Sequence, residues 1–266
     1  MPRANRYFIS GHVWHITHRC HKKEFLLKFA KDRKTWIHWL FESRKRYGIE
    51  VLNYAVTSNH IHLLVYGSGN REIIPRSLQL TAGRTAQSFN QRKMRKGAFW
   101  EDRYHATAVD TDEHFIRCMT YIDLNMVRAG AVQHPSEWPH GGYQEIIDPP
   151  SRYRIISRSR LAQLLRTDDD ALSGIYRRYV DNAKPLRKMR DDAWTGAIAV
   201  GRVQFIEKIK EQLGAAVSKR REMKTGLPDV ACALQERLSP YNAHLDGKMD
   251  VLSPENRLLW NIFDEN

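Results

Sequence analysis

Two apolar segments separated by only two residues constrain the fold of this chain more than any other feature. Residues 49–57 and 60–66 mix β-branched, aromatic and polar side chains in the manner of strands. Ser58 and Asn59 lie between them and suit a tight connection. The two strands are therefore expected to pair as an antiparallel hairpin.

Segments of helical and strand character flank this hairpin on both sides. Gly48 is expected to end the helix that precedes it, and Gly130 lies near the end of the last helix. Strands are predicted over residues 6–19 and 98–109, and helices over residues 24–47, 72–94 and 113–128. The order strand, helix, strand, strand, helix, strand, helix is typical of an α+β fold: a ferredoxin-like antiparallel sheet with helices on one face.

The chain is long enough, at 266 residues, for one good-sized core or for one domain with a smaller appendage. Residues 134–153 are rich in proline and glycine, which places a domain boundary there. A catalytic domain is expected over residues 1–150, and a mostly helical region over residues 151–266. That region begins basic, with 18 basic and 9 acidic residues up to residue 225, and ends in an acidic tail.

The overall charge points to a polyanionic partner. The chain carries 43 basic and 30 acidic residues, a net charge of +13, and nucleic acid is the commonest partner of such a protein. No apolar run approaches the length of a membrane helix, and the N-terminus lacks the apolar stretch of a signal peptide. We therefore expect a cytoplasmic protein without a membrane partner.

The motif His60-Ile61-His62 is the sharpest local signal of chemistry. Residues i and i+2 of a strand point to the same face, so both imidazoles can reach one metal ion while Ile61 points to the core. Two histidine ligands suit Mn²⁺, and Mg²⁺ can substitute when oxygen ligands complete the shell. The plainer interpretation is that the two histidines occupy the polar face of a half-buried strand.

A second signal lies in the last predicted helix of the catalytic domain. Tyr121 and Asn125 are four residues apart and therefore share a helix face. A tyrosine hydroxyl is a weak nucleophile that needs an electrophile activated by a metal, or a nearby base. The amide oxygen of Asn125 is a candidate third metal ligand, with His105 and Asp123 as competitors. Taken alone, Tyr121 could equally be an amphipathic core residue.

Together the two signals resemble the single-tyrosine HUH transposases, in which two histidines flank a hydrophobic residue. The sequence is most similar to the REP-associated tyrosine transposases over roughly residues 3–150. The segments that carry the resemblance are GHVWHITHRCHKKEF at 11–25, SNHIHLLVYG at 58–67, FWEDRYHATAVDTDEHFIRCMTYIDLNMVRAGAV at 99–132 and WPHGGY at 138–143. Thr57-Ser58 stand where the family often has Met-Pro, and Met126 stands where it often has proline; neither position is a proposed ligand or nucleophile.

The resemblance implies a function and a mechanism. A divalent metal, Mg²⁺ or Mn²⁺, is held by His60, His62 and Asn125. Tyr121 attacks a phosphate of single-stranded DNA next to a hairpin, leaving a free 3′-hydroxyl and a 5′-phosphotyrosine. Another 3′-hydroxyl then attacks that link and rejoins the strand. The family also implies a monomer or a homodimer.

Two groups of residues are candidates for holding DNA. Arg103, Tyr104 and His105 precede the catalytic helix, where the charged groups could bind phosphate and Tyr104 could stack on a base. The basic run Arg92, Lys93, Arg95 and Lys96 ends the second helix and could grip a hairpin stem. Each group could equally form a solvated polar surface.

The alternative function is a domesticated protein that binds DNA hairpins without cutting them. Other enzyme classes fit less well: His60-Ile61-His62 is not a His-x-Thr motif to accompany His15-Ile16-Thr17, position 64 is leucine rather than histidine, and no HExxH helix is present.

The acidic tail suggests a regulatory hypothesis. Residues 226–266 contain 3 basic and 7 acidic residues, so the tail could fold onto a basic face and compete with DNA. Deleting residues 226–266 is then expected to tighten the binding of a single-stranded hairpin oligonucleotide, measured by fluorescence anisotropy. An unchanged dissociation constant would remove the hypothesis.

Overall fold

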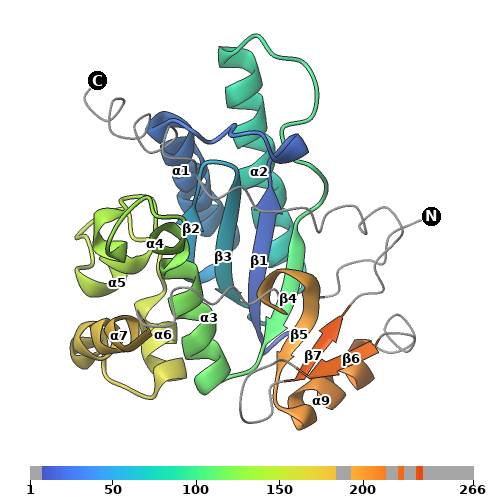
Figure 1. Ribbon diagram of the computed structural model, residues 1–266, viewed down its shortest axis with the longest axis vertical. Helices are drawn as coiled ribbons and strands as arrows, with labels where there is room; N and C mark the ends of the chain where they lie inside the picture. The colour runs from blue at the N-terminus through green and yellow to red at the C-terminus, as the bar shows by residue number, and fades with distance from the viewer. Residues whose placement is uncertain (1–7, 184–192, 214–220, 225–231, 236–266) are drawn as a thin grey trace.

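The computed structural model describes residues 8–183, 193–213, 221–224 and 232–235 (Figure 1). The first part of the chain contains, in order, β1 (Val13–Arg19), η1 (His21–Lys23), α1 (Ala30–Tyr47), β2 (Glu50–Val56), β3 (His60–Tyr66), α2 (Ile73–Arg92), β4 (His105–Val109), α3 (Glu113–Asp123) and α4 (Asn125–Arg128). The elements that follow are η2 (Pro135–Glu137), α5 (Tyr143–Ile147), α6 (Arg158–Leu165), α7 (Asp169–Ala183), α8 (Ala193–Gly196), β5 (Ala197–Gly201), α9 (Val203–Leu213), β6 (Arg221–Lys224) and β7 (Cys232–Gln235).

The strands form one sheet in the order β2-β3-β1-β4-β5-β7-β6. The predicted hairpin is confirmed, because β2 pairs with β3 in antiparallel register. Strand β1 lies between β3 and β4 and is antiparallel to both. The first four strands in the sheet therefore have the predicted ferredoxin-like arrangement, and the α+β class is confirmed.

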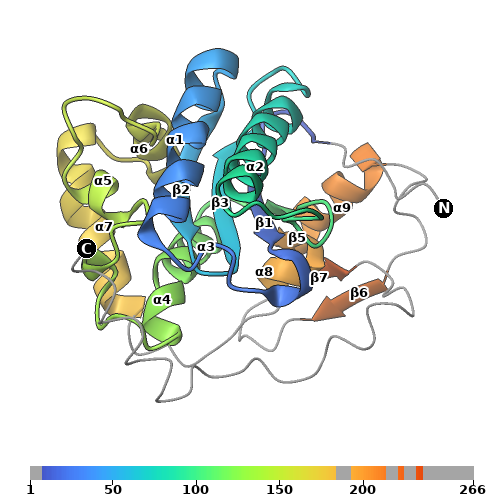
Figure 2. The ribbon, with the colours of Figure 1, turned by 90° about the horizontal axis from the view of Figure 1, so that it is seen from above.

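Helices cover both faces of this sheet, which corrects the expectation of helices on one face only. Figure 2 shows α1 and α2 on one side and α3 on the other. Tyr54 contacts Trp36 of α1, whereas its neighbour Asn53 donates to Asp123 at the end of α3. Neighbouring strand residues point to opposite faces, so both faces of β2 are covered. The sheet is buried on both sides here, and a second helical layer is needed to remove it from water.

Several predicted elements begin later than expected. Strand β1 begins at Val13 rather than residue 6, α1 begins at Ala30 rather than residue 24, and β4 begins at His105 rather than residue 98. Ahead of β4, Trp100 forms only an isolated bridge with Cys20, and its indole donates to the carbonyl of Ala82 in α2. Gly48 ends α1 as predicted, with a left-handed φ of 73° that favours glycine.

The described part of the region after residue 150 is mostly helical, as predicted, and it also contains three short strands. Helices α6, α7 and α9 are present, but β5 also extends the sheet by pairing in parallel with β4, and β7 and β6 follow it. Leu161, Tyr176 and Ile198 belong to the same buried cluster as the sheet. The predicted domain boundary near residue 150, which would separate two parts that fold independently, stays a prediction.

Most of the acidic tail lies outside the described residues. Strand β7 lies inside the segment 226–266, so a deletion from residue 236 tests the tail hypothesis without removing a sheet strand. Among the described residues, no helix is both long and apolar enough to cross a bilayer.

A buried polar network joins the sheet, α3 and α7. Asp123 is fully buried and accepts hydrogen bonds from the Asn53 amide, at 3.0 Å, and from the Tyr176 hydroxyl. Burial raises the pKa of Asp123 to about 7, and the two hydrogen bonds oppose this shift. The carboxyl group therefore keeps its proton in the folded chain up to a higher pH than in the unfolded chain.

This raised pKa predicts a pH-dependent loss of stability. Folding takes up a proton between the unfolded pKa of about 4 and the folded pKa of about 7, so stability falls as the pH rises through that window. The substitution Asp123→Asn should flatten the dependence of the unfolding free energy on pH by up to about 1.4 kcal/mol per pH unit. Denaturant titrations at pH 5, 6 and 7 measure the slope. Parallel curves for the variant and the wild type would contradict the raised pKa.

Candidate active site

The strand register brings three polar side chains onto the α3 face of the sheet. In β1, Thr17 pairs with His62 and His15 pairs with Leu64 of β3, and on its other side His15 pairs with Thr107 of β4. His15 and His62 are therefore diagonal neighbours on one face. All three side chains are buried, with exposed fractions of 0% for His15 and Thr107 and 1% for His62.

His62 has a partner at each ring nitrogen. Its Nδ1 lies 3.0 Å from Nε2 of His15, and its Nε2 lies 3.0 Å from the side-chain amide of Asn125. The imidazole is therefore fixed in position between β1 and α4. Because amide oxygen and nitrogen can be exchanged by a flip, either atom of Asn125 can face the ring.

His60 lies at the start of β3, half-buried, on the same face as His62. Its Nδ1 lies 2.7 Å from the side-chain oxygen of Asn59 and 3.0 Å from the Thr57 hydroxyl. The oxygen of Asn59 can only accept, so Nδ1 of His60 donates and Nε2 carries the lone pair. The rings of His60 and His62 are 4.9 Å apart, in line with the predicted strand geometry.

Tyr121 and Asn125 reach this face across a break in the predicted helix. Leu124, with φ −75° and ψ 2°, separates α3 from α4. Arg128 bridges the break, because its guanidinium donates to the Tyr121 carbonyl at 2.6 Å and lies 4.2 Å from the centre of the Tyr121 ring. The Tyr121 ring lies 5.8 Å from the His62 ring and 6.3 Å from the His15 ring.

Trp194, in α8, lies beside His15 of β1 and borders the candidate site. Its main-chain carbonyl lies 2.9 Å from Nδ1 of His15, and its indole lies 6.4 Å from the Tyr121 ring. The side chain of Trp194 is buried, with 3% exposed. A residue far along the chain therefore borders the histidine pair and the tyrosine together.

Both buried imidazoles are neutral at ordinary pH. Burial lowers the pKa of His15 to about 3, against the opposing effect of the hydrogen bond to Trp194. Burial also holds the pKa of His62 well below its usual value, and electrostatic interactions with neighbouring residues, Arg128 and Arg19 among them, lower this pKa further. Neutral imidazole is the form that binds metal ions.

The donor set suits a hard divalent ion that also takes oxygen ligands from elsewhere. Among the described residues, no three histidine, cysteine or carboxylate side chains gather as a metal site. The side chain that meets His62 there is the amide of Asn125, a candidate third ligand. Two ligands at right angles around an ion, each at about 2.1 Å, lie about 3.0 Å apart. The distance of 3.0 Å between Nε2 of His62 and the Asn125 amide is compatible with such a pair.

The two competing ligand candidates are engaged elsewhere. Asp123 faces Asn53 and Tyr176. Nε2 of His105 lies 2.8 Å from the carbonyl of Ala197 in β5, which can only accept, so the ring donates there. Asn125 is the candidate whose side chain meets His62.

The predicted DNA contacts are divided between the two sides of the sheet. Arg103 is exposed, whereas Tyr104 is half-buried against the core, with its ring 6.2 Å from that of Phe8. The run Arg92, Lys93, Arg95 and Lys96 lies at the end of α2, in the helical layer on the face opposite the histidines. Arg92 forms an ion pair with Asp32, and Arg95 lies 3.7 Å from Glu24.

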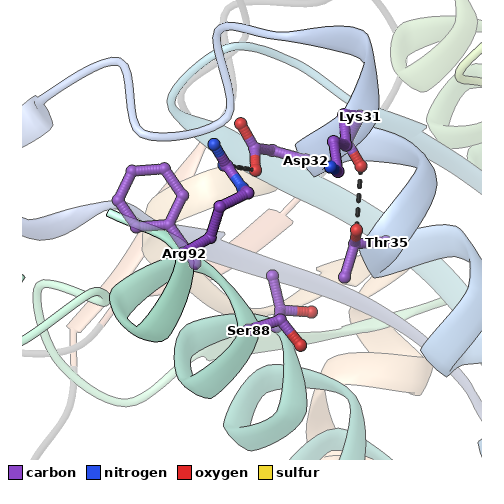
Figure 3. Close-up of a pocket in the computed structure, with 7 residues that line it drawn as sticks. Lys31, Asp32, Thr35, Ser88 and Arg92 are labelled. Atoms are coloured by element: carbon purple, nitrogen blue, oxygen red, sulfur yellow. Dashed lines mark hydrogen bonds and ion pairs between the residues drawn. The ribbon is translucent and has the colours of Figure 1, made fainter. Parts of the chain in front are cut away.

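A cavity of about 170 Å³ between α1 and α2 contains that ion pair. Figure 3 shows Asp32 of α1 and Arg92 of α2 pointing toward each other across it. The cavity lies in the helical layer away from β3 and α3, so it is separate from the candidate active site.

Sequence reasoning missed two neighbours of His62. His15 was not assigned to the site, yet it lies two residues before Thr17 on the same face of β1, and Thr17 pairs with His62. The pairing of β1 with β3 was therefore the signal that could have identified it. Trp194 lies in a region without any readable motif, and only the folded chain brings it to the site.

Comparison with known proteins gives a family for this region. Residues 9–125 match the family model described as "Transposase IS200 like". The matched stretch includes His15, His60, His62, Tyr121 and Asn125, and it ends before the helical region that carries Trp194. No curated protein matches the sequence.

Two solved structures align over part of the chain. One is a REP-associated tyrosine transposase bound to a REP hairpin, with 19% identity, 55% of this chain and 86% of that chain covered, and a TM-score of 0.45. The other is a candidate transposase from Deinococcus radiodurans, with 17% identity, 41% and 85% coverage, and a TM-score of 0.32. At these scores neither likeness carries a conclusion about this chain.

The family match covers just under half of the sequence but contains every catalytic and metal-binding candidate. Residues 9–125 are therefore similar to the IS200-like transposase family.

Proposed function

We propose that this protein is a transposase that cuts and rejoins single-stranded DNA next to hairpins, with Tyr121 as the nucleophile. One observation supports the proposal above all: Tyr121, His62 and Asn125 converge on one face of the sheet. The Tyr121 and His62 rings are 5.8 Å apart, and the Asn125 amide lies 3.0 Å from Nε2 of His62. The family match supports the reaction class, because a transposase must break and rejoin phosphodiester bonds.

The proposed step is a transesterification. The phenol oxygen of Tyr121 loses its proton and forms a bond to phosphorus, while the bond from phosphorus to the 3′-oxygen breaks. The 3′-oxygen takes up a proton and leaves as a free hydroxyl, and the 5′ end stays on the tyrosine. Attack by another 3′-hydroxyl reverses the same exchange, so no external energy source is needed. Arg128 holds Tyr121 in place through its ring and its carbonyl.

His60, His62 and Asn125 would hold the divalent metal, Mg²⁺ or Mn²⁺. Such an ion, when bound, withdraws charge from the scissile phosphate and makes phosphorus a better electrophile for a weak nucleophile. The half-buried positions of His60, Tyr121 and Asn125 leave an approach for a DNA strand, while His62 lies beneath them.

The DNA itself would be held by basic and aromatic side chains around this opening and beyond it. Arg103 and Tyr104 precede β4 and are suited to phosphate binding and base stacking. Arg92, Lys93, Arg95 and Lys96 lie in the other helical layer and would contact a stem that extends past the sheet. His105 is held by Ala197 and would act by anchoring β5.

A substitution at Tyr121 tests whether its hydroxyl is the nucleophile. The substitution Tyr121→Phe removes only the hydroxyl, so it should abolish a covalent adduct with a 3′-labelled hairpin oligonucleotide in the presence of Mn²⁺. Denaturing gel electrophoresis detects the adduct. The exposed Tyr153, with 75% of its surface accessible, gives a matched control, and Tyr153→Phe should keep the wild-type yield.

An adduct that survives in Tyr121→Phe would refute Tyr121 as the nucleophile. Tight hairpin binding by the wild type with no adduct under any metal condition would instead favour the alternative function, a binding protein that does not cut.

The second prediction concerns Asn125 as a metal ligand. Asn125→Ala should weaken Mn²⁺ binding by about tenfold or more, whereas Asn125→Asp, which keeps an oxygen donor, should retain it. Isothermal titration calorimetry measures both dissociation constants. Asn70→Ala, in the loop before α2, is the control. An Asn125→Ala affinity equal to that of the control would exclude Asn125 from the ligand set.

A further inference from the structure

A chain of hydrogen bonds runs from the main chain of α8 to the candidate metal site. It begins at the carbonyl of Trp194, which lies 2.9 Å from Nδ1 of His15. It continues from Nε2 of His15 to Nδ1 of His62, at 3.0 Å. It ends where Nε2 of His62 meets the Asn125 amide, also at 3.0 Å.

The carbonyl of Trp194 determines which nitrogen donates and which accepts in each of these hydrogen bonds. A main-chain carbonyl can only accept, so Nδ1 of His15 carries a hydrogen. In a neutral ring, Nε2 of His15 then carries the lone pair and must accept from Nδ1 of His62. Nε2 of His62, in turn, carries the lone pair that faces Asn125. Each ring therefore has one allowed tautomer.

The ring geometry agrees with this direction. The planes of the two imidazoles differ by only 10°, and their centres are 5.1 Å apart while their nearest nitrogens are 3.0 Å apart. The rings therefore meet edge to edge in nearly one plane rather than face to face. Both the N–H bond and the lone pair of an imidazole lie in the ring plane, so this arrangement suits a linear hydrogen bond.

Burial keeps water away from the hydrogen bond between His15 and His62. His15 has no exposed surface and His62 has 1%, so water does not compete for either Nδ1 or Nε2 at their contact. Thr107, on the neighbouring strand, donates to the carbonyl of Ala197 at 2.6 Å, which helps to fix the start of β5 directly after α8. The carbonyl of Trp194 is thus held close to β4, the strand that pairs with the β1 strand of His15.

We infer that His15 is a positioning residue that locks His62 in the tautomer with its Nε2 lone pair directed at the metal, and that the Trp194 carbonyl sets this direction. The inference rests on the proposed function, since it assigns His62 to a metal. His15 does not touch the metal or DNA in this scheme; it acts through His62. Partners of this kind typically change metal affinity by about 10- to 100-fold when they are removed.

The tautomer itself provides the first test, and it requires neither metal nor DNA. Long-range ¹H–¹⁵N correlation spectra of the ¹⁵N-histidine-labelled full-length protein distinguish the two tautomers, and the His62 signals are assigned by their loss in His62→Gln. His62 is expected to carry its hydrogen on Nδ1 in the wild type. A hydrogen on Nε2 would overturn the inference whatever the DNA activity is.

Variants of His15 provide the second test. His15→Phe fills a similar volume without an acceptor, and it should weaken Mn²⁺ binding by about 10- to 100-fold and shift His62 toward the other tautomer. His15→Gln supplies an acceptor oxygen and should recover most of the affinity. The control is His140→Phe, since His140 is also buried, with 3% exposed, but packs near Trp138 away from the site.

The outcomes separate this inference from the proposed function. Equal Mn²⁺ affinities for His15→Phe and His140→Phe would overturn the positioning role even if the wild type forms the DNA adduct. Loss of the adduct in Tyr121→Phe would bear on the nucleophile alone. If His15→Phe does not fold, the wild-type tautomer and the comparison of His15→Gln with the wild type still decide the question, because an altered tautomer or a lost affinity in His15→Gln would contradict the inference.

Discussion

The contact between two buried imidazoles, His15 and His62, is the interaction on which the geometry of the candidate active site depends. A charged group in such a place would be costly, and burial lowers the pKa of both rings, so the pair is stable as two neutral rings that share one hydrogen bond. Each ring needs a polar partner on its other side, because an unsatisfied buried nitrogen is also costly. Trp194 and Asn125 supply these partners from opposite directions.

Because His15 needs a polar partner for its Nδ1, the region after residue 150, which contains Trp194, contributes to the candidate active site. Strand β5 joins the sheet beside β4, and the carbonyl of Ala197 accepts from both His105 and Thr107. At the other end of β5, Asp110 accepts hydrogen bonds from the main chain and side chain of Arg202. A side chain at Gly201 would collide with Asp110, since an added Cβ would lie 2.4 Å from the Cβ of that residue. The pairing between β4 and β5 is therefore closely packed at both ends of β5.

The sequence alone was sufficient for the local part of this structure. The short Ser58-Asn59 connection determined the hairpin, and the two-residue repeat of a strand placed His60 and His62 together. The order of elements also predicted the class of fold. The limits of helices and strands were less predictable, because aromatic residues such as Trp100 pack against α2 instead of extending a strand. The register of β1 on β3 and the pairing of β4 with β5 could not be derived, so His15 and Trp194 were missed.

Charge is distributed differently at the surface and at the site. The chain has a net charge of +13, which favours encounter with DNA over distances comparable to the Debye length. At the site, the imidazoles of His15 and His62 are neutral, and the nearest fixed charges on His62 come from Arg128 and Arg19. These guanidiniums repel a divalent ion, whereas a DNA phosphate attracts both the ion and the arginines. The proposed chemistry therefore needs the phosphate as the group that balances the positive charges, and metal and DNA should favour each other's binding at this face.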